Sequence, residues 1–274
     1  MSRGGERPLI RLVVRVPAAD GEAVLGALLE IAPGGLEQHD GDDWVEYALY
    51  GAAAELPRLP DGRGEIAGVT VEVARERVPG DWSERWKAFH RPALIGERLY
   101  LRPPWEPPLA RDVIDLVIDP GQAFGTGTHP TTRLCLELML DLPGRGAFAD
   151  LGCGSGVLAI AAAKLGFSPV IALDADRAAI EATRANARAN AVALDRLERV
   201  DLRGTPAPRA DVVVANLMRP LLGQMARRAA ARPPTLIASG LLEHEIDEVV
   251  NAFAPMVEHE RRCERGWGAV ALRG

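Results

Sequence analysis

The stretch ADLGCGSGVLAIAAAKLG, residues 149–166, decides the fold of this chain. A short apolar run ends in three alternating glycines, Gly152, Gly154 and Gly156, and an Ala-rich run follows them. This order predicts a buried strand, a tight turn in which the backbone can approach a ligand closely, and a helix. It is the first βα unit of an α/β domain, and its glycine turn marks the edge of the sheet where ligands bind.

Strands and helices alternate from this unit to the C-terminus. The predicted strands are AFADL, VIALD, LERVDL, DVVVAN, TLIAS, MVEHERRC and WGAVALR. Repeated βα units indicate a mostly parallel sheet, here of seven strands, with helices on both faces. The last two strands form an antiparallel pair, whereas a plain dinucleotide-binding fold would continue in parallel. A further helix is predicted from Pro130 to about Leu140, before the first strand, because proline fits the first turn of a helix.

The chain upstream of this region is predicted to hold a second, smaller domain. Residues 1–76 show the order strand, helix, two strands, a weak Ala-rich helix at 51–56 and a final strand, which predicts an α+β, ferredoxin-like domain. Residues 77–118 are predicted to be a structured linker with a helix, DWSERWKAFHRP, and two strands, RLYLRP and RDVIDLVID. Residues 119–274 then form the α/β domain.

Composition excludes several classes of protein. The 274 residues carry a formal net charge of −6, which argues against broad nucleic-acid binding. Three cysteines lie far apart without metal-ligand spacing, so neither a disulfide framework nor a metal site is expected, and a reducing cytoplasm is the simplest location. The N-terminus lacks the apolar core of a signal peptide, and the longest apolar run is too short to span a membrane.

The glycine turn and the acids around it suggest the ligand. Asp174 follows Gly152 by 22 residues, at the end of the next predicted strand, where a carboxylate can accept hydrogen bonds from ribose hydroxyls. In a dinucleotide fingerprint the third glycine would stand one position later, where this chain has Val157. Asp150, two residues before the first glycine, is poorly placed beside a pyrophosphate but well placed for the ammonium group of a methionine. The pattern therefore favours S-adenosylmethionine over a nicotinamide or flavin dinucleotide.

Asn216 is the candidate catalytic residue. It ends the predicted strand DVVVAN, next to the same crevice, where amino-group methyltransferases often place Asn or Asp before two prolines. Its oxygens can accept hydrogen bonds from a target nitrogen and direct the lone pair at the methyl group. Leu217 and Met218 replace the prolines, so the match is partial, and a plain role at the end of the strand stays open.

The chain resembles the PrmA family in DPGQAFGTGTHPTT (residues 119–132), in DLGCGSGVLAIAAAKLG, in ALDAD and in VVVANLM. The resemblance implies a class I S-adenosylmethionine-dependent methyltransferase with a Rossmann-like sheet. Such an enzyme methylates, and often trimethylates, α-amino and lysine side-chain amines of large-subunit ribosomal protein eleven, in the stalk base. Gln122 and the proline-broken second helix of the N-terminal domain depart from the family pattern.

Carried over position by position, the family's cofactor contacts fall on Thr132, Gly152, Asp174 and Asn216. Phe124 would cover the cofactor, and Thr131 could replace Thr132 in a shifted alignment. His129 could act as a base, but capping the helix that begins at Pro130 explains it at least as well. The sequence-derived cofactor site thus comprises Thr132, Gly152, Asp174, Asn216, Phe124, Asp150 and Gly154, without a metal.

The N-terminal domain is expected to hold the protein substrate, in a cytoplasmic monomer. One alternative is a related methyltransferase with another target, such as lysines of a non-ribosomal protein or an amino group on nucleic acid. Two others are an NAD-dependent oxidoreductase and a non-catalytic binding module.

Overall fold

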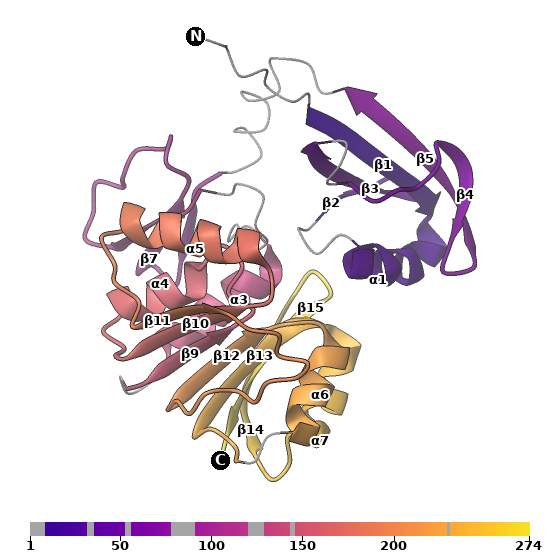
Figure 1. Ribbon diagram of the computed structural model, residues 1–274. Coiled ribbons are helices and arrows are strands. Elements are labelled where there is room, and N and C mark those ends of the chain that lie inside the picture. Colours follow the sequence, from indigo (N-terminus) through magenta and orange to yellow (C-terminus); the bar gives the residue numbers. More distant parts are fainter. Residues whose placement is uncertain are drawn as a thin grey trace. The chain divides into compact units, whose positions relative to one another are not determined.

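The computed structural model describes residues 9–31, 36–52, 56–77, 91–119, 129–142, 146–228 and 231–274. The chain divides into two compact units, Met1–Phe89 and His90–Gly274 (Figure 1).

The first unit is an antiparallel sheet with one described helix. Its strands lie in the order β2-β3-β1-β5-β4. The elements are β1 (Leu9–Pro17), α1 (Gly21–Ile31), β2 (Glu37–Asp40), β3 (Trp44–Ala52), β4 (Gly62–Ile66) and β5 (Val69–Arg77), with a 3₁₀ turn at Ala18–Asp20. Leu12, Val14 and Val16 alternate along β1 and share a buried core with Val24 and Leu28 of α1. This alternation is the period of a strand that buries one face.

Two details of this unit differ from the prediction. The expected Ala-rich helix at 51–56 is wrong at its start, because Gly51 and Ala52 continue β3; residues 53–55 lie outside the described part. Strand β4, which the sequence did not predict, forms a hairpin with β5 through Ala67 and Gly68, both at positive φ. Its sequence, GRGEI, has a single β-branched residue, so propensity alone gives no strand signal. Of the predicted helix at 81–92, residues 81–90 lie outside the described part.

The second unit contains a seven-stranded sheet in the order β11-β10-β9-β12-β13-β15-β14. The strands are β9 (Phe148–Leu151), β10 (Val170–Asp174), β11 (Arg196–Arg199), β12 (Val212–Asn216), β13 (Thr235–Leu242), β14 (Val257–Glu264) and β15 (Trp267–Arg273). The first five pair in parallel, β15 runs antiparallel to β13, and β14 runs antiparallel to β15. The predicted class I methyltransferase sheet with its terminal antiparallel hairpin is therefore confirmed.

Helices cover both faces of this sheet (Figure 1). They are α3 (Pro130–Leu140), α4 (Val157–Lys164), α5 (Arg177–Ala189), α6 (Arg219–Arg228) and α7 (Ile246–Ala252), with a 3₁₀ turn at Glu243–Glu245. Apolar side chains of α3, α4 and α5 share one core with the sheet, and those of α6 and α7 share the other. The predicted helix from Pro130 to Leu140 is confirmed. The chain reverses direction across the sheet between β9 and β12, which creates the crevice in which α/β proteins bind ligands.

A small sheet of three strands also belongs to the second unit. It contains β6 (Ala93–Ile95), β7 (Leu99–Arg102) and β8 (Ile114–Val117), in that order. Their buried side chains, including Ile95 and Leu116, join the core beneath α3 and α4. The boundary between compact units thus falls at Phe89/His90, inside the segment 77–118 that the sequence predicts as a linker. The assignment of roles to 1–76, 77–118 and 119–274 stays a prediction.

Candidate active site

The glycine turn between β9 and α4 adopts a backbone that side chains would block. Gly152, Gly154 and Gly156 have φ values of 78°, 53° and 82°. A Cβ atom on Gly152 would collide with the side chain of Leu217, and one on Gly156 would lie 2.7 Å from Cγ2 of Thr183. The turn therefore requires glycine at these two positions, because Leu217 and Thr183 pack closely against its backbone.

Asp174 lies beside the glycine turn, as predicted. Its Oδ2 accepts a hydrogen bond from the Gly154 amide at 2.9 Å, and its Oδ1 accepts one from the Asp176 amide at 2.9 Å. The side chain is only partly buried. A carboxylate held by two backbone amides at the carboxyl end of β10 is fixed in direction and still has lone pairs for a ligand's hydroxyl groups.

Asp150 is fully buried beneath the turn. Its Oδ2 accepts a hydrogen bond from the Ala159 amide at 3.1 Å, and its Oδ1 has no hydrogen-bond partner among the described residues. Gly156, at the N-cap of α4, has no side chain, so Asp150 supplies the acceptor that the first turn of this helix needs. Burial, with a smaller contribution from the charge of Asp174, raises the pKa of Asp150 to about 7. The sequence did not predict this helix-capping contact.

Asn216 ends β12 and meets the first turn of α3. Its Nδ2 lies 3.2 Å from Oγ1 of Thr131 and 3.4 Å from Oγ1 of Thr132. Both threonines are 1% exposed. Oδ1 of Asn216 is buried and accepts no hydrogen bond within the described part of the chain. The structure thus brings together Asn216 and Thr132, which the sequence assigned to one site, and Asn216 keeps a buried acceptor oxygen at the carboxyl end of β12.

His129 is the N-cap residue of α3, which confirms the capping interpretation. Its Nδ1 accepts from the Thr131 amide at 3.4 Å and lies 2.8 Å from the Thr131 hydroxyl oxygen. The ring packs edge-on against Trp267, with 4.8 Å between centroids. Burial lowers the pKa of His129 to about 4, so the imidazole is neutral at physiological pH. A weak base whose Nδ1 is already engaged is poorly suited to remove a proton from a substrate.

Three polar residues that the sequence did not predict fix the glycine turn and its surroundings: Thr183 and Asn186 on α5, and Asn190 at the C-cap of that helix. Thr183 donates to the Gly154 carbonyl at 2.9 Å, and Asn186 donates to the Ser155 carbonyl at 2.9 Å. Oδ1 of Asn186 also accepts from the Asp119 amide at 3.0 Å. Asn190 pairs with the backbone N–H and C=O of Val117, at 2.9 and 2.6 Å.

A signal for these residues exists in the sequence. Thr183, Asn186 and Asn190 recur at helical spacing, on the same face as the apolar residues Ala179 and Ile180. Polar side chains on a face that should be apolar must find partners when they are buried. That rule predicts backbone partners, but it does not identify them.

Phe124, which the sequence predicts to cover the cofactor, lies outside the described residues. Cys153 is buried with its Sγ 3.3 Å from the Thr183 hydroxyl, and burial raises the pKa of its thiol. A protonated, buried thiol is a packing group rather than a nucleophile.

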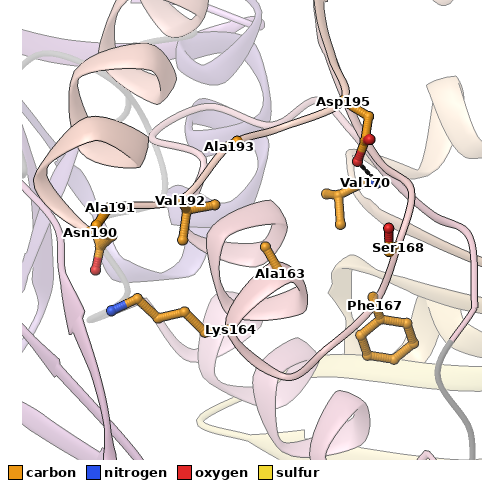
Figure 2. Close-up of a pocket in the computed structure, with 10 residues that line it drawn as sticks. All are labelled: Ala163, Lys164, Phe167, Ser168, Val170, Asn190, Ala191, Val192, Ala193 and Asp195. Carbon is orange, nitrogen blue, oxygen red and sulfur yellow. Dashed lines mark hydrogen bonds between the residues drawn. The ribbon is translucent and has the colours of Figure 1, made fainter.

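A separate cavity of 380 Å³ lies at the other end of the strands (Figure 2). It is lined by the end of α4 and by the loops that precede β10 and β11. Its two charged side chains already have protein partners: Lys164 donates to the Asp115 carbonyl, and Asp195 accepts from the Val170 amide. Ligands of α/β folds bind at the carboxyl ends of the strands, so the crevice at Gly152 and Asn216 is the candidate active site.

Comparison with known proteins agrees with this placement. A family described as ribosomal protein L11 methyltransferase (PrmA) matches residues 56–273. The chain belongs to the PrmA family. Ribosomal protein L11 methyltransferases of Klebsiella pneumoniae (strain 342) and Salmonella heidelberg (strain SL476) are 34% and 43% identical to it, and each alignment covers 93% of this chain and 97% of the relative.

A solved structure resembles the chain as well. The ribosomal protein L11 methylase of Lactobacillus delbrueckii subsp. bulgaricus is 27% identical, with a TM-score of 0.60, and the match covers 67% of this chain and 98% of that chain. The fold of this PrmA-family member therefore has a counterpart among solved structures. None of the helices in the described ranges has the length and apolar character needed to cross a membrane.

Proposed function

We propose that this PrmA-family chain transfers methyl groups from S-adenosylmethionine to amines of ribosomal protein L11, at the α-amino group and at lysine side chains, up to trimethylation. The observation that carries the proposal is the buried Oδ1 of Asn216, which accepts no hydrogen bond from any described residue and lies at the carboxyl edge of a class I sheet. A buried carbonyl oxygen without a partner is costly, and a hydrogen-bond donor on a substrate would satisfy it.

The residues around the turn fit the proposed cofactor. Asp174 would accept from ribose hydroxyls, since two backbone amides hold its carboxylate at the sheet edge. The backbone of Gly152 and Gly154 would line the methionine portion. Asp150 has one buried oxygen without a partner in the described residues, which suits a positive charge such as an ammonium group. Thr132 would contact the cofactor from the first turn of α3.

When bound, the cofactor would supply a methyl group activated on a sulfonium; as the N–C bond to a neutral amine forms, the S–C bond breaks, so that S-adenosylhomocysteine leaves and the methylated nitrogen carries the positive charge. The protein's task is to present that amine in its neutral form and in line. At neutral pH, deprotonating a lysine costs roughly 4 kcal/mol and an α-amino group about 1 kcal/mol. Oδ1 of Asn216 accepts one N–H of the neutral amine and so turns its lone pair towards the methyl group. His129 is too weak a base to take the proton of the target ammonium group. That proton therefore leaves to water before the substrate is enclosed.

The proposal extends to the rest of the chain. The first unit would hold the ribosomal protein while the second carries out the transfer, as part of a cytoplasmic monomer acting on a protein of the ribosomal stalk base. Removing residues 1–76 should abolish methylation of L11 and leave S-adenosylmethionine binding intact. Retained methylation would contradict the recruiting role.

The main test uses S-adenosylmethionine labelled on its methyl group with purified ribosomal proteins, followed by mass spectrometry of the labelled products. Label on L11 amines is the expected result. In Asn216→Ala the rate of transfer should fall far more than cofactor affinity, because the side chain acts on the amine. Near-normal turnover in this variant would remove Asn216 from the mechanism. Label only on a non-ribosomal protein or on RNA would overturn the substrate assignment.

A further inference from the structure

Three side chains form a continuous hydrogen-bonded chain from the helix cap to the candidate catalytic amide. His129 Nδ1 lies 2.8 Å from Thr131 Oγ1, and Thr131 Oγ1 lies 3.2 Å from Asn216 Nδ2. Thr131 is 1% exposed, and Asn216 is partly buried. These contacts join the helix cap directly to the amide of Asn216.

The direction of this chain follows from counting protons. Nδ1 of His129 accepts the Thr131 backbone N–H, so this nitrogen carries a lone pair and the ring proton sits on Nε2. The hydroxyl of Thr131 has one proton, and Nδ1 is its acceptor. Oγ1 of Thr131 therefore faces Asn216 as an acceptor, and only the NH₂ end of the amide can face it.

We propose that His129 is a positioning residue that, through Thr131, fixes the orientation of the Asn216 amide and so keeps its oxygen turned towards the target amine. This inference rests on the proposed methyl transfer. In the reversed orientation, Oδ1 of Asn216 would face Oγ1 of Thr131, two acceptors at 3.2 Å, and the NH₂ group would face the substrate. The N–H groups of Asn216 would then face the N–H groups of the target amine, with no acceptor between them. Asn216 could only donate to the lone pair of the amine and would turn it away from the methyl group.

The surroundings hold both ends of the chain in place. Ser239 Oγ is 3.4 Å from the Thr131 carbonyl and 2.9 Å from the Gly268 carbonyl, which ties the first turn of α3 to β13 and β15. Trp267 packs against the edge of the His129 ring. Burial keeps His129 neutral, because it lowers the pKa of the ring to about 4, so Nδ1 stays an acceptor over the working pH range.

The experiment compares steady-state methylation of L11 by the full-length wild-type protein and four variants. Thr131→Val removes the hydroxyl with little change in shape, and His129→Ala removes the acceptor. His129→Asn restores an acceptor oxygen near the position of Nδ1 and is a good N-cap. The double variant His129→Ala/Thr131→Val closes a mutant cycle. Cofactor affinity is measured separately by calorimetry with S-adenosylhomocysteine.

We expect kcat to fall about ten- to hundredfold in both His129→Ala and Thr131→Val, with KM for L11 and cofactor affinity changed less than about threefold. The double variant should lose no more than either single variant, and His129→Asn should recover most of the loss. Circular dichroism and thermal unfolding identify any variant that fails to fold, and in that case Thr131→Val, which leaves the helix cap in place, decides the question.

Three outcomes would overturn the inference: a kcat of Thr131→Val close to that of the wild type, additive losses in the double variant, or no recovery in His129→Asn. A role of His129 restricted to capping α3 predicts the first outcome, with an effect of His129→Ala on stability alone. If the wild-type protein itself transfers no methyl group to L11, the proposed function fails, and this result is distinct from a failure of the positioning role.

Discussion

Replacing Asn186 by Ala should weaken cofactor binding, although this side chain lies beneath the glycine turn rather than in the crevice. Asn186 is 2% exposed, donates to the Ser155 carbonyl at 2.9 Å and accepts from the Asp119 amide at 3.0 Å. A third contact, to the Asp119 carbonyl at 3.5 Å, is too long to add much. The change therefore removes two good hydrogen bonds, one of them to the carbonyl of the fully buried residue Ser155.

The magnitude follows from these contacts. Each of the two hydrogen bonds contributes about 1 kcal/mol net, so the second unit should lose about 2 kcal/mol of stability. If about 1 kcal/mol of this loss comes from a glycine turn that is no longer held in place, the Kd for S-adenosylhomocysteine should rise about fivefold.

Asn190→Ala is the matched control, one turn further along α5. Asn190 makes three hydrogen bonds of 2.6 to 2.9 Å, to Val117 and to the Asn186 carbonyl, but none to the glycine turn. It should cost at least as much stability in urea unfolding and change the Kd less than about twofold, since about 0.4 kcal/mol is the corresponding free energy. Calorimetry with S-adenosylhomocysteine measures the Kd of both variants, and urea unfolding measures their stability. Equal effects of the two variants on Kd would refute the reasoning, because a general loosening of α5 would then explain them.

Three further variants test other parts of the molecule. Asp174→Ala should raise the Kd for S-adenosylmethionine more than about tenfold, because a fixed acceptor for ribose hydroxyls is lost; an unchanged Kd in calorimetry would remove Asp174 from the site. Asp150 has a folded-state pKa of about 7, above its ordinary value of 3.8, so its stabilising contribution is complete below pH 4 and is lost as the pH rises to 7. Asp150→Asn removes this dependence, and urea unfolding should show the variant gaining up to about 4 kcal/mol relative to the wild type between pH 4 and pH 8. In the first unit, Glu46 pairs with Arg11 and Arg15. Glu46→Ala should lower the free energy of unfolding of that unit by about 1–3 kcal/mol without changing cofactor affinity.

Local sequence signals were sufficient where a residue's role depends on its own position in the chain. The glycine turn after β9, the start of α3 at Pro130 and the terminal hairpin all follow from turn residues, proline and alternation. Asn216 and Asp174 could be located because the carboxyl ends of parallel strands lie at one edge of the sheet. A residue that ends such a strand therefore lies near the crevice.

The sequence could not reveal the roles that depend on residues distant in the chain. Asp150 accepts the hydrogen bond that an N-cap side chain would accept, because Gly156 has no side chain. This contact is evident only from the positions of both residues in the structure. Asn186 and Asn190 hold segments 67 and 73 residues away. Strand β4 forms because β5 offers an edge, although its own residues have little strand propensity. In each case the tertiary partner, rather than local preference, decides the outcome.

The stretch DPGQAFGTGTHPTT, residues 119–132, is fixed to the candidate site at both of its described ends. Its first residue, Asp119, is bound through its backbone amide to Asn186, which also holds the glycine turn. Its last four residues cap α3 and present Thr131 and Thr132 to Asn216. The two anchors use different helices and reach different strands, but both end at the carboxyl edge of the sheet. A change at either end should therefore affect the site differently. Loss of Asn186 should disturb the glycine turn and lower cofactor affinity, whereas loss of His129 should disturb the amide of Asn216 and lower the rate of transfer. Measuring Kd and kcat in the two variants separates these effects, because each predicts a large change in one quantity and a small change in the other.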